Sequence, residues 1–225
     1  MSEAKAAAGR AAAEHVESGM QLGLGTGSTV AFFLDALAER GVDVAGVPTS
    51  EATAERCREL GIALLEPGEV ERLDLCVDGA DELTPALELT KGGGGALLRE
   101  KVVATMSERM IVIATPDKVV ERLGDSFPLP VEVVPFAVGP VSRRCEALGL
   151  EPTLRGEGDY RTDNGNAILD LRREGGIEDL EAVSAELSTI PGVCEHGLFL
   201  GLADLALLGR DDGTTEELSS GLLTT

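Results

Sequence analysis

Three short stretches of this sequence concentrate residue types that bind anions and move protons. Residues 23–30 read GLGTGSTV, residues 77–83 read VDGADEL, and residues 90–101 read TKGGGGALLREK. The first offers backbone N–H groups and hydroxyls, the second crowds carboxylates, and the third places a lysine and a glutamate around four glycines. Such groups suit a small anionic substrate that loses a proton bonded to carbon.

The stretch at residues 23–30 has the pattern of an anion cradle. A glycine-rich turn between a strand and a helix presents N–H groups at the helix N-terminus. The spacing is not the dinucleotide fingerprint G-x-G-x-x-G, and the stretch lacks the Gly-Lys-Ser/Thr of a P-loop. The hydroxyls of Thr26, Ser28 and Thr29 favour phosphate. A tight turn with Ser28 or Thr29 as the helix N-cap is the simpler alternative.

The acidic stretch places Asp78, Asp81 and Glu82 at the end of an apolar run. Like charges this close disfavour joint ionisation, so the pKa of one carboxyl is expected to rise. From the residues alone, these carboxylates suit a metal ion, sugar hydroxyls or proton exchange. An acidic loop in an acidic protein remains the alternative without a function.

The glycine run lies between Lys91 and Glu100, and Glu100 falls about one turn into a predicted helix. Four consecutive glycines cost backbone entropy and build no core, so a group that needs close approach to the backbone is expected there. The chain has only four lysines, Lys5, Lys91, Lys101 and Lys118. A cation, free backbone and a carboxylate favour deprotonation of a carbon acid, with a flexible loop as the alternative.

Alternating strand and helix patterns are expected to place these stretches on one rim of a parallel sheet, where the strands end. The N-terminus is predicted to be helical, without the basic start and apolar run of a signal peptide. The remaining predicted elements of this part are strands at 20–27, 44–50, 62–65, 73–81 and 109–116 and helices at 28–40, 51–60 and 96–108, the first two ended by Gly41 and Gly61.

The pattern changes near Ser126, where three prolines fall within residues 127–135. Beyond it the order β-α-β-β-α-β predicts a ferredoxin-like unit. Its elements are strand 130–135, helix 139–148, strand 152–155 continuing towards 162, strand 166–171, helix 178–187 and strand 193–200. Asn-Gly within residues 162–167 predicts a type I′ turn. An apolar strand at 203–209 then rejoins the first sheet, and the polar tail ends weakly. The predicted domains are 1–126 with 201–225, and 127–200.

Composition limits the class of protein. The chain has 225 residues, 43% of them hydrophobic, and a net charge of −21. That charge argues against nucleic acid as a partner, and no apolar run is long enough to cross a membrane. A cytoplasmic protein is expected. The side chains that most often bind metals are widely spaced, which favours neutral thiols in a reducing compartment and histidines in packing roles. They are Cys57, Cys76, Cys145, Cys194, His15 and His196.

In this order and spacing, the motifs GxGTGST, DGADE and KGGGGALLREK resemble the type A family of ribose-5-phosphate isomerases. The similarity continues through FPLPVEVVP, TDNGNAILD, IPGVCEHGLF and ADLALLG, so it covers nearly the whole chain. The resemblance implies a Rossmann-like α/β domain with a smaller inserted α+β domain. It also implies an enzyme of the non-oxidative pentose phosphate pathway that interconverts ribose 5-phosphate and ribulose 5-phosphate without metal or organic cofactor.

The resemblance implies that Glu100 is the catalytic base, with Asp78, Asp81 and Lys91 as further catalytic residues. Asp81 and Lys91 would move protons as the furanose opens. Glu100 would take a proton from C2 and return it to C1 through a cis-enediolate, and the sequence leaves open whether its neighbours raise its pKa or Lys91 lowers it. The implied substrate-binding residues are Lys5, Gly25, Thr26, Gly27, Ser28, Thr29, Asp78, Gly79, Asp81, Lys91, Gly92, Gly93, Gly94 and Lys118.

Three further expectations follow from the resemblance. Many members carry an alanine in the glycine run, so Gly92–Gly95 predicts a more pliable loop with no lost contact. Members are commonly dimers or tetramers, so a homodimer or homotetramer is expected, with the small domain as a contact surface. The basic residues of the site are expected to form a local positive pocket, because a phosphorylated sugar must approach a strongly negative protein.

Two alternatives remain open at this stage. An aminosugar-phosphate deaminase-isomerase on a similar fold would need further acid–base groups, and only two histidines are present. A non-catalytic sugar-phosphate sensor would be expected to carry a DNA-binding segment, which is hard to reconcile with so acidic a chain. Turnover, as opposed to binding without turnover, separates the isomerase from the sensor.

The acid-rich, lysine-poor composition is typical of proteins from salt-loving organisms, in which molar salt screens the repulsion between carboxylates. We therefore expect the melting temperature of the purified protein to rise from low to molar KCl, as measured by thermal unfolding. A flat or falling curve would mean that the acidity has no role in salt tolerance.

Overall fold

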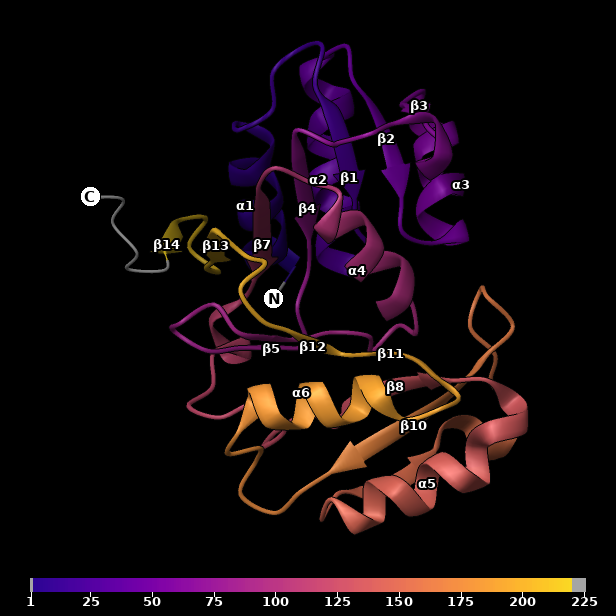
Figure 1. Cartoon of the computed structure of the whole chain (residues 1–225). Coiled ribbons are helices and arrows are strands. Elements are labelled where there is room, and N and C mark those ends of the chain that lie inside the picture. Colours follow the sequence, from indigo (N-terminus) through magenta and orange to yellow (C-terminus); the bar gives the residue numbers. More distant parts are fainter. Residues whose placement is uncertain (1, 220–225) are drawn as a thin grey trace.

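The computed structural model describes residues 2–219, and its centre is a seven-stranded sheet with the order β14-β13-β7-β4-β1-β2-β3 (Figure 1). Neighbouring strands are parallel except β13 and β14. The predicted parallel sheet is therefore confirmed. Its strands are β1 (Gln21–Leu24), β2 (Ala45–Pro48), β3 (Ala63–Leu64), β4 (Leu75–Asp78), β7 (Met110–Ala114), β13 (Leu205–Gly209) and β14 (Thr215–Ser219).

Both faces of this sheet are covered, because its central strands are apolar on both sides. In β7, Ile111 and Ile113 pack into a core shared with α1 and α2, whereas Met110 and Val112 pack into a second core with α4. Helices α2 and α3 end at glycines in the left-handed backbone region, as predicted. The helices of this part are α1 (Ser2–Ala13), α2 (Ser28–Arg40), α3 (Glu51–Leu60) and α4 (Leu97–Thr105).

The segment inserted after β7 forms a four-stranded antiparallel sheet with the order β11-β8-β10-β9. Two helices pack on one face of it around a separate core. The predicted fold class, a Rossmann-like parallel-sheet domain with a smaller ferredoxin-like α+β unit, is confirmed. The elements of this unit are β8 (Leu129–Val133), α5 (Val138–Ala147), β9 (Glu151–Leu154), β10 (Ala167–Arg172), α6 (Leu180–Thr189) and β11 (Val193–His196).

Two local predictions in the inserted unit are wrong. The strand predicted to continue towards 162 stops at Leu154, because Gly156 and Glu157 in the short helix η4 (Arg155–Gly158) have φ values of +60° and +53°. The Asn-Gly turn is not type I′, which needs positive φ at both central residues. Only Gly165 in that turn has a positive φ.

The predicted strand 193–200 is divided between two sheets. After β11, Gly197 bends the chain, and β12 (Leu198–Phe199) pairs with β6 (Leu89–Thr90), which pairs with β5 (Glu82–Leu83). A Cβ on Gly197 would lie 2.2 Å from the carbonyl oxygen of Lys91. The division thus follows from a close backbone contact that the sequence pattern does not reveal.

The described part of the polar tail, up to Ser219, forms a strand after β13. It returns as β14 and pairs antiparallel along the edge of the main sheet, which requires backbone groups and not apolar side chains. Met1 and residues 220–225, which the predicted domain ranges include, lie outside the described residues.

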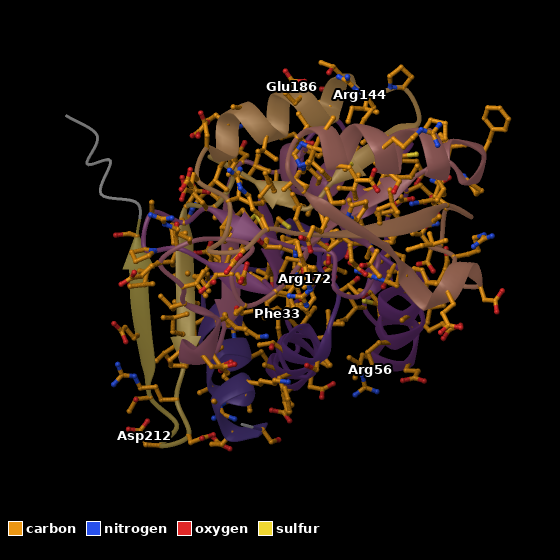
Figure 2. All side chains as sticks on the ribbon, turned by 90° about the horizontal axis from the view of Figure 1, so that it is seen from below. Phe33, Arg56, Arg144, Arg172, Glu186 and Asp212 are labelled. Carbon is orange, nitrogen blue, oxygen red and sulfur yellow. The ribbon has the colours of Figure 1, made fainter. Side chains whose placement is uncertain are left out.

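Charged side chains cover the surface, and apolar ones fill the cores (Figure 2). Arg56, Glu186 and Asp212 lie at the periphery of the view, whereas Phe33 is fully buried. Within residues 2–219, no helix is both long and apolar enough to span a bilayer.

Helices α1 and α2 approach so closely that a Cβ on Gly9 would lie 2.7 Å from the backbone nitrogen of Phe33. We expect Gly9→Ala to lower the free energy of unfolding by about 1–3 kcal/mol, because overpacking outweighs the gain in helix propensity. The matched control is Gly139→Ala in α5, where the nearest atom is 3.7 Å away. It should raise the free energy of unfolding by about 0.5–1 kcal/mol. Equal effects in denaturant titrations would contradict this packing argument.

Candidate active site

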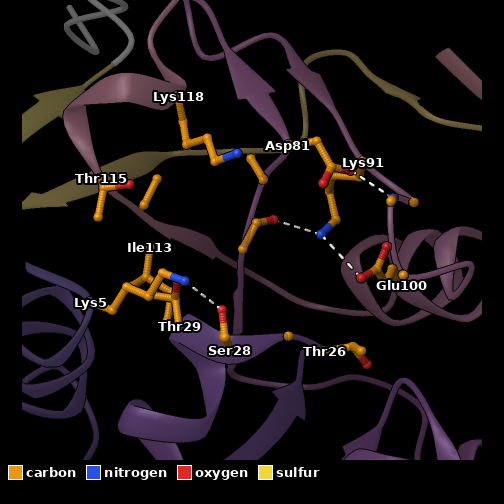
Figure 3. A pocket seen from close by; sticks show the side chains of 17 residues that line it. Lys5, Thr26, Ser28, Thr29, Asp81, Lys91, Glu100, Ile113, Thr115 and Lys118 are labelled. Carbon is orange, nitrogen blue, oxygen red and sulfur yellow. Dashed lines mark hydrogen bonds and ion pairs between the residues drawn. The ribbon is translucent and has the colours of Figure 1, made fainter. Parts of the chain in front are cut away.

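The turn after β1 opens onto the N-terminus of α2. Gly27 is the N-cap residue, with a φ of +120° that favours glycine. Ser28 and Thr29 occupy the first helical turn instead, so the N-cap predicted at one of them is wrong. Lys5 of α1 donates from Nζ to Ser28 Oγ at 2.8 Å (Figure 3). The helix N-terminus and this ammonium together favour an anion.

Thr26 and Gly25 support this turn from behind. Thr26 Oγ1 lies 2.7 Å from Thr49 Oγ1 and 2.8 Å from Ser50 Oγ, and the Thr26 N–H donates to Asp78 Oδ1 at 3.0 Å. The Gly25 N–H donates to a backbone carbonyl of β4, and a Cβ there would lie 2.2 Å from Asp78 Oδ1. The polar groups of these two predicted ligands are thus engaged inside the protein.

A buried ammonium joins two buried carboxylates at the centre of the site. Lys91 Nζ lies 3.0 Å from Asp78 Oδ2 and 3.4 Å from Glu100 Oε1, and it donates to the Gly79 carbonyl at 2.6 Å (Figure 3). Lys91 is 2% exposed and Glu100 5%. Asp78 is the last residue of β4, Lys91 comes directly after β6, and Glu100 lies in α4, so three separate elements meet here.

Burial dominates the protonation of these groups. It raises the pKa of Glu100 to about 8, with Asp78 and Asp81 adding to the shift and Lys91 opposing it. Burial also raises the pKa of Asp81, against the Gly93 N–H and Lys91, which lower it. Burial lowers the pKa of Lys91, but the carboxylates Asp78 and Glu100 outweigh it, so the pKa is raised and the ammonium stays charged. The balance that the sequence left open therefore favours a raised pKa for Glu100.

The glycine loop, residues 92–95, is constrained at three of its four positions. Gly92 and Gly95 have φ values of +102° and +81°. A Cβ on Gly93 would lie 2.4 Å from Asp81 Oδ1, and the Gly93 N–H donates to Asp81 Oδ2 at 2.7 Å. Within this loop, only a Cβ on Gly94 would have no neighbouring atom within 4 Å. At three of the four positions, a positive φ or a close neighbouring atom therefore requires glycine.

The residue after Glu100 ties α4 to the inserted unit. Lys101 Nζ donates to Glu195 Oε1 at 2.8 Å and to the His196 carbonyl at 2.7 Å. The Phe199 ring lies between the two lysines, 5.4 Å from Lys91 Nζ and 5.0 Å from Lys101 Nζ. Burial, followed by the charge of Lys101, lowers the pKa of His196 to about 4, so this histidine is neutral and packed.

A pocket of about 220 Å³ brings these groups together (Figure 3). Apart from Gly25 and Asp78, every predicted site residue lines it. Lys5 and Lys118 lie at one side, and Lys91 and Glu100 at the other. The motifs did not single out four lining residues at the carboxyl ends of β4 and β7, although their place at strand ends was a usable signal. These are Ala80, Ile113, Ala114 and Thr115.

The fold and the pocket define the class: an α/β enzyme that binds a small anion at the carboxyl ends of parallel strands, beside a buried acid–base pair. The model of the family "Ribose 5-phosphate isomerase A (phosphoriboisomerase A)" matches residues 45–213. Ribose-5-phosphate isomerase A of Agrobacterium fabrum is 52% identical, covering 93% of this chain and 94% of its own.

Comparison with solved structures points to the same family. Ribose 5-phosphate isomerase A from Neisseria gonorrhoeae superposes with a TM-score of 0.92 at 39% identity and covers 97% of each chain. A D-ribose-5-phosphate isomerase in complex with phospho-erythronic acid gives 0.91 at 37% identity, covering 96% of this chain and 98% of its own. The chain belongs to the ribose 5-phosphate isomerase A family. The predicted family, fold class and isomerase function are confirmed.

The raised pKa of Glu100 has a kinetic consequence. The resemblance implies that Glu100 is the base, and a base works only when deprotonated, so kcat/KM should rise with a midpoint near pH 8 and level off about one pH unit above it. Asp78→Asn removes a neighbouring negative charge, so the pKa of Glu100 falls and the rising limb should move to lower pH. An unchanged midpoint in pH–rate profiles of the two proteins would contradict this assignment.

Proposed function

We propose that this pocket interconverts ribose 5-phosphate and ribulose 5-phosphate through an enediolate, with Glu100 as the base. The observation that carries the proposal is the position of the Glu100 carboxylate. It is buried, lines the pocket, and faces Lys91 through Oε1, while Oε2 has no hydrogen-bond partner within residues 2–219. A dry, incompletely satisfied carboxylate with a raised pKa is suited to accept a proton from carbon.

In the proposed reaction, Glu100 takes the proton from C2 of the open-chain aldose, the hydroxyl proton passes from O2 to O1 of the enediolate, and Glu100 returns its proton to C1. When the proton reaches Glu100, the negative charge passes to the enediolate oxygens. Lys91 remains cationic and interacts with whichever group carries that charge, so it stabilises both states without moving. Asp81, whose pKa is raised, is proposed to exchange the ring-oxygen and hydroxyl protons during ring opening.

The phosphate group is proposed to bind at the opposite side of the pocket. The N-terminus of α2 at Gly27–Thr29 supplies N–H groups and hydroxyls, and Lys5 and Lys118 supply positive charge. This separation gives the substrate a direction, with the phosphate at the lysine pair and the carbonyl end at Glu100. It also provides the local positive region that a protein of net charge −21 needs for an anionic substrate.

Several finer features belong to the same proposal. We propose domains at 1–126 with 201–225 and at 127–200, which is supported by the separate core of the inserted unit. A homodimer or homotetramer is supported by Phe136, which is 95% exposed on that unit. A cytoplasmic location is supported by four free thiols. We further propose that the reaction needs neither metal nor cofactor.

The decisive experiment measures ketose formation from ribose 5-phosphate by the purified protein with EDTA present. Turnover is expected, and Glu100→Gln should lower kcat by about 10²–10⁴-fold while substrate binding is largely retained, because the amide cannot accept the proton. Full activity of the variant would refute Glu100 as the base. Loss of wild-type activity in EDTA would refute the metal-free reaction.

Lys5→Ala and Lys118→Ala test the phosphate end. Each removes one charge-assisted contact, so KM for ribose 5-phosphate should rise about tenfold, with a smaller change in kcat. Unphosphorylated ribose is the control, because its kcat/KM should not respond to either substitution. Unchanged KM for the phosphorylated sugar would remove these lysines from the phosphate site.

A further inference from the structure

Two side chains of the inserted unit hold the glycine loop by its carbonyl groups. Arg155 Nη1 donates to the carbonyl oxygens of Gly92 and Gly93 at 3.1 and 3.0 Å. Tyr160 Oη donates to the carbonyl oxygen of Gly94 at 3.1 Å. Neither side chain lines the pocket. Three successive carbonyls of the loop are therefore bound from outside the substrate site.

Holding the carbonyls also sets the direction of the N–H groups. A trans peptide is planar, so its N–H points opposite to its C=O. The peptide whose Gly92 carbonyl faces Arg155 sends the Gly93 N–H to Asp81 Oδ2, 2.7 Å away. By the same geometry, the next peptide directs the Gly94 N–H away from Arg155, and Gly94 is one of the residues that line the pocket. That N–H has no protein acceptor within residues 2–219.

The two holding side chains are themselves fixed. Asp170 of β10 binds Arg155 in a two-pronged pair, with Nε–Oδ2 at 2.9 Å and Nη2–Oδ1 at 2.5 Å. The side chains of Arg155 and Asp170 are largely buried, at 16% and 19% exposure. The Tyr160 ring lies 5.5 Å from the Arg155 guanidinium carbon. This arrangement leaves Nη1 of Arg155 directed at the loop, and we call Arg155, Tyr160 and Asp170 the carbonyl clamp.

The backbone on both sides is adapted to this contact. Between Arg155 and Tyr160 the chain passes through Gly156 and Glu157 at positive φ, which is unfavourable for a glutamate. A Cβ on Gly95 would lie 1.7 Å from Tyr160 Oη. A turn in an unfavourable conformation therefore meets a loop position that excludes any side chain.

We infer that Arg155 and Tyr160 are positioning residues for the isomerisation. The carbonyl clamp holds the Gly94 N–H as a donor for the enediolate oxygen, in the same pocket as the Lys91 ammonium. The inference rests on the proposed function, since it assigns the oxyanion donor of that reaction. A preoriented donor needs no reorganisation when charge develops, and this is the main source of its effect on rate.

The first test compares kcat and KM in variants of the clamp. Tyr160→Phe removes one hydroxyl and should lower kcat about fivefold, the factor that one ordinary hydrogen bond is worth. Arg155→Met leaves the Gly93 carbonyl without this donor and the Gly92 carbonyl with only the Gly95 N–H, and should lower kcat about 100-fold through misplacement of the donor. KM for ribose 5-phosphate should change less than twofold, because the phosphate end is untouched.

Arg161→Met is the matched control. Arg161 lies in the same segment but donates only to the carbonyls of Gly158 and Tyr160. Its kcat should equal that of the wild type, and an equal fall would show that any disturbance of this segment suffices, which overturns the inference. Melting temperatures of all variants are measured alongside. If Arg155→Met does not fold, Tyr160→Phe carries the test.

The second test probes the Gly94 N–H donor by comparing the binding affinities of two ligands. Phospho-erythronic acid, the compound in the related structure, is a sugar-acid phosphate whose carboxylate supplies the negative charge that the donor would bind. Erythritol 4-phosphate has the same carbon chain without that charge. The clamp variants should weaken binding of the acid by the same factor as kcat and leave erythritol 4-phosphate unchanged. Equal weakening of both ligands, or of neither, would overturn the inference.

Glu100→Gln, measured in parallel, separates the two levels of the argument. If that variant keeps full activity, the proposed function fails whatever the clamp variants do. If it is inactive while Tyr160→Phe and Arg155→Met match the wild type, only the positioning role fails.

Discussion

The burial of one ammonium group organises this structure. A buried charge is tolerated only with partners, and loss of one partner leaves the others uncompensated. Lys91 therefore requires Asp78 from the main sheet and Glu100 from α4 at the same point, and the Phe199 ring packs beside it. The small sheet of β5, β6 and β12 supplies the backbone that carries Lys91 there. The N–H of Lys91 donates to the Gly197 carbonyl at 2.9 Å, which also fixes where the inserted unit returns.

The same ion cluster explains how a strongly negative protein handles an anion. Its carboxylates are directed at Lys91, so near the reacting carbons their field is partly compensated. At the other side of the pocket, Lys5 donates to Ser28 at the N-terminus of α2, which carries its own partial positive charge, and Lys118 also lines the pocket. The pocket thus has one region of fixed positive charge, at Lys5 and Lys118. In the other region, at Lys91 and Glu100, the proposed reaction moves charge.

Local patterns predicted much of this molecule, because strands, helices and their glycine ends at Gly41 and Gly61 are encoded over a few residues. The motifs also predicted the residues that gather in the pocket. The failures share a cause in tertiary contacts. The break at Gly197 depends on the close approach of the Lys91 backbone, which no local pattern reveals. Strands of two residues, such as β5 and β6, are too short to show the alternation of apolar and polar residues that identifies a strand.

Helix α4 is fastened on both sides by consecutive residues, with Glu100 facing Lys91 and Lys101 bound to Glu195 and the His196 carbonyl. The inserted unit is thus part of the framework that holds α4 and the proposed base Glu100, although it supplies none of the residues lining the pocket. Trimming the protein to its parallel-sheet core would remove one of the two anchors of α4. For protein engineers, the insertion is a poor place to shorten this enzyme and a natural place to tune it.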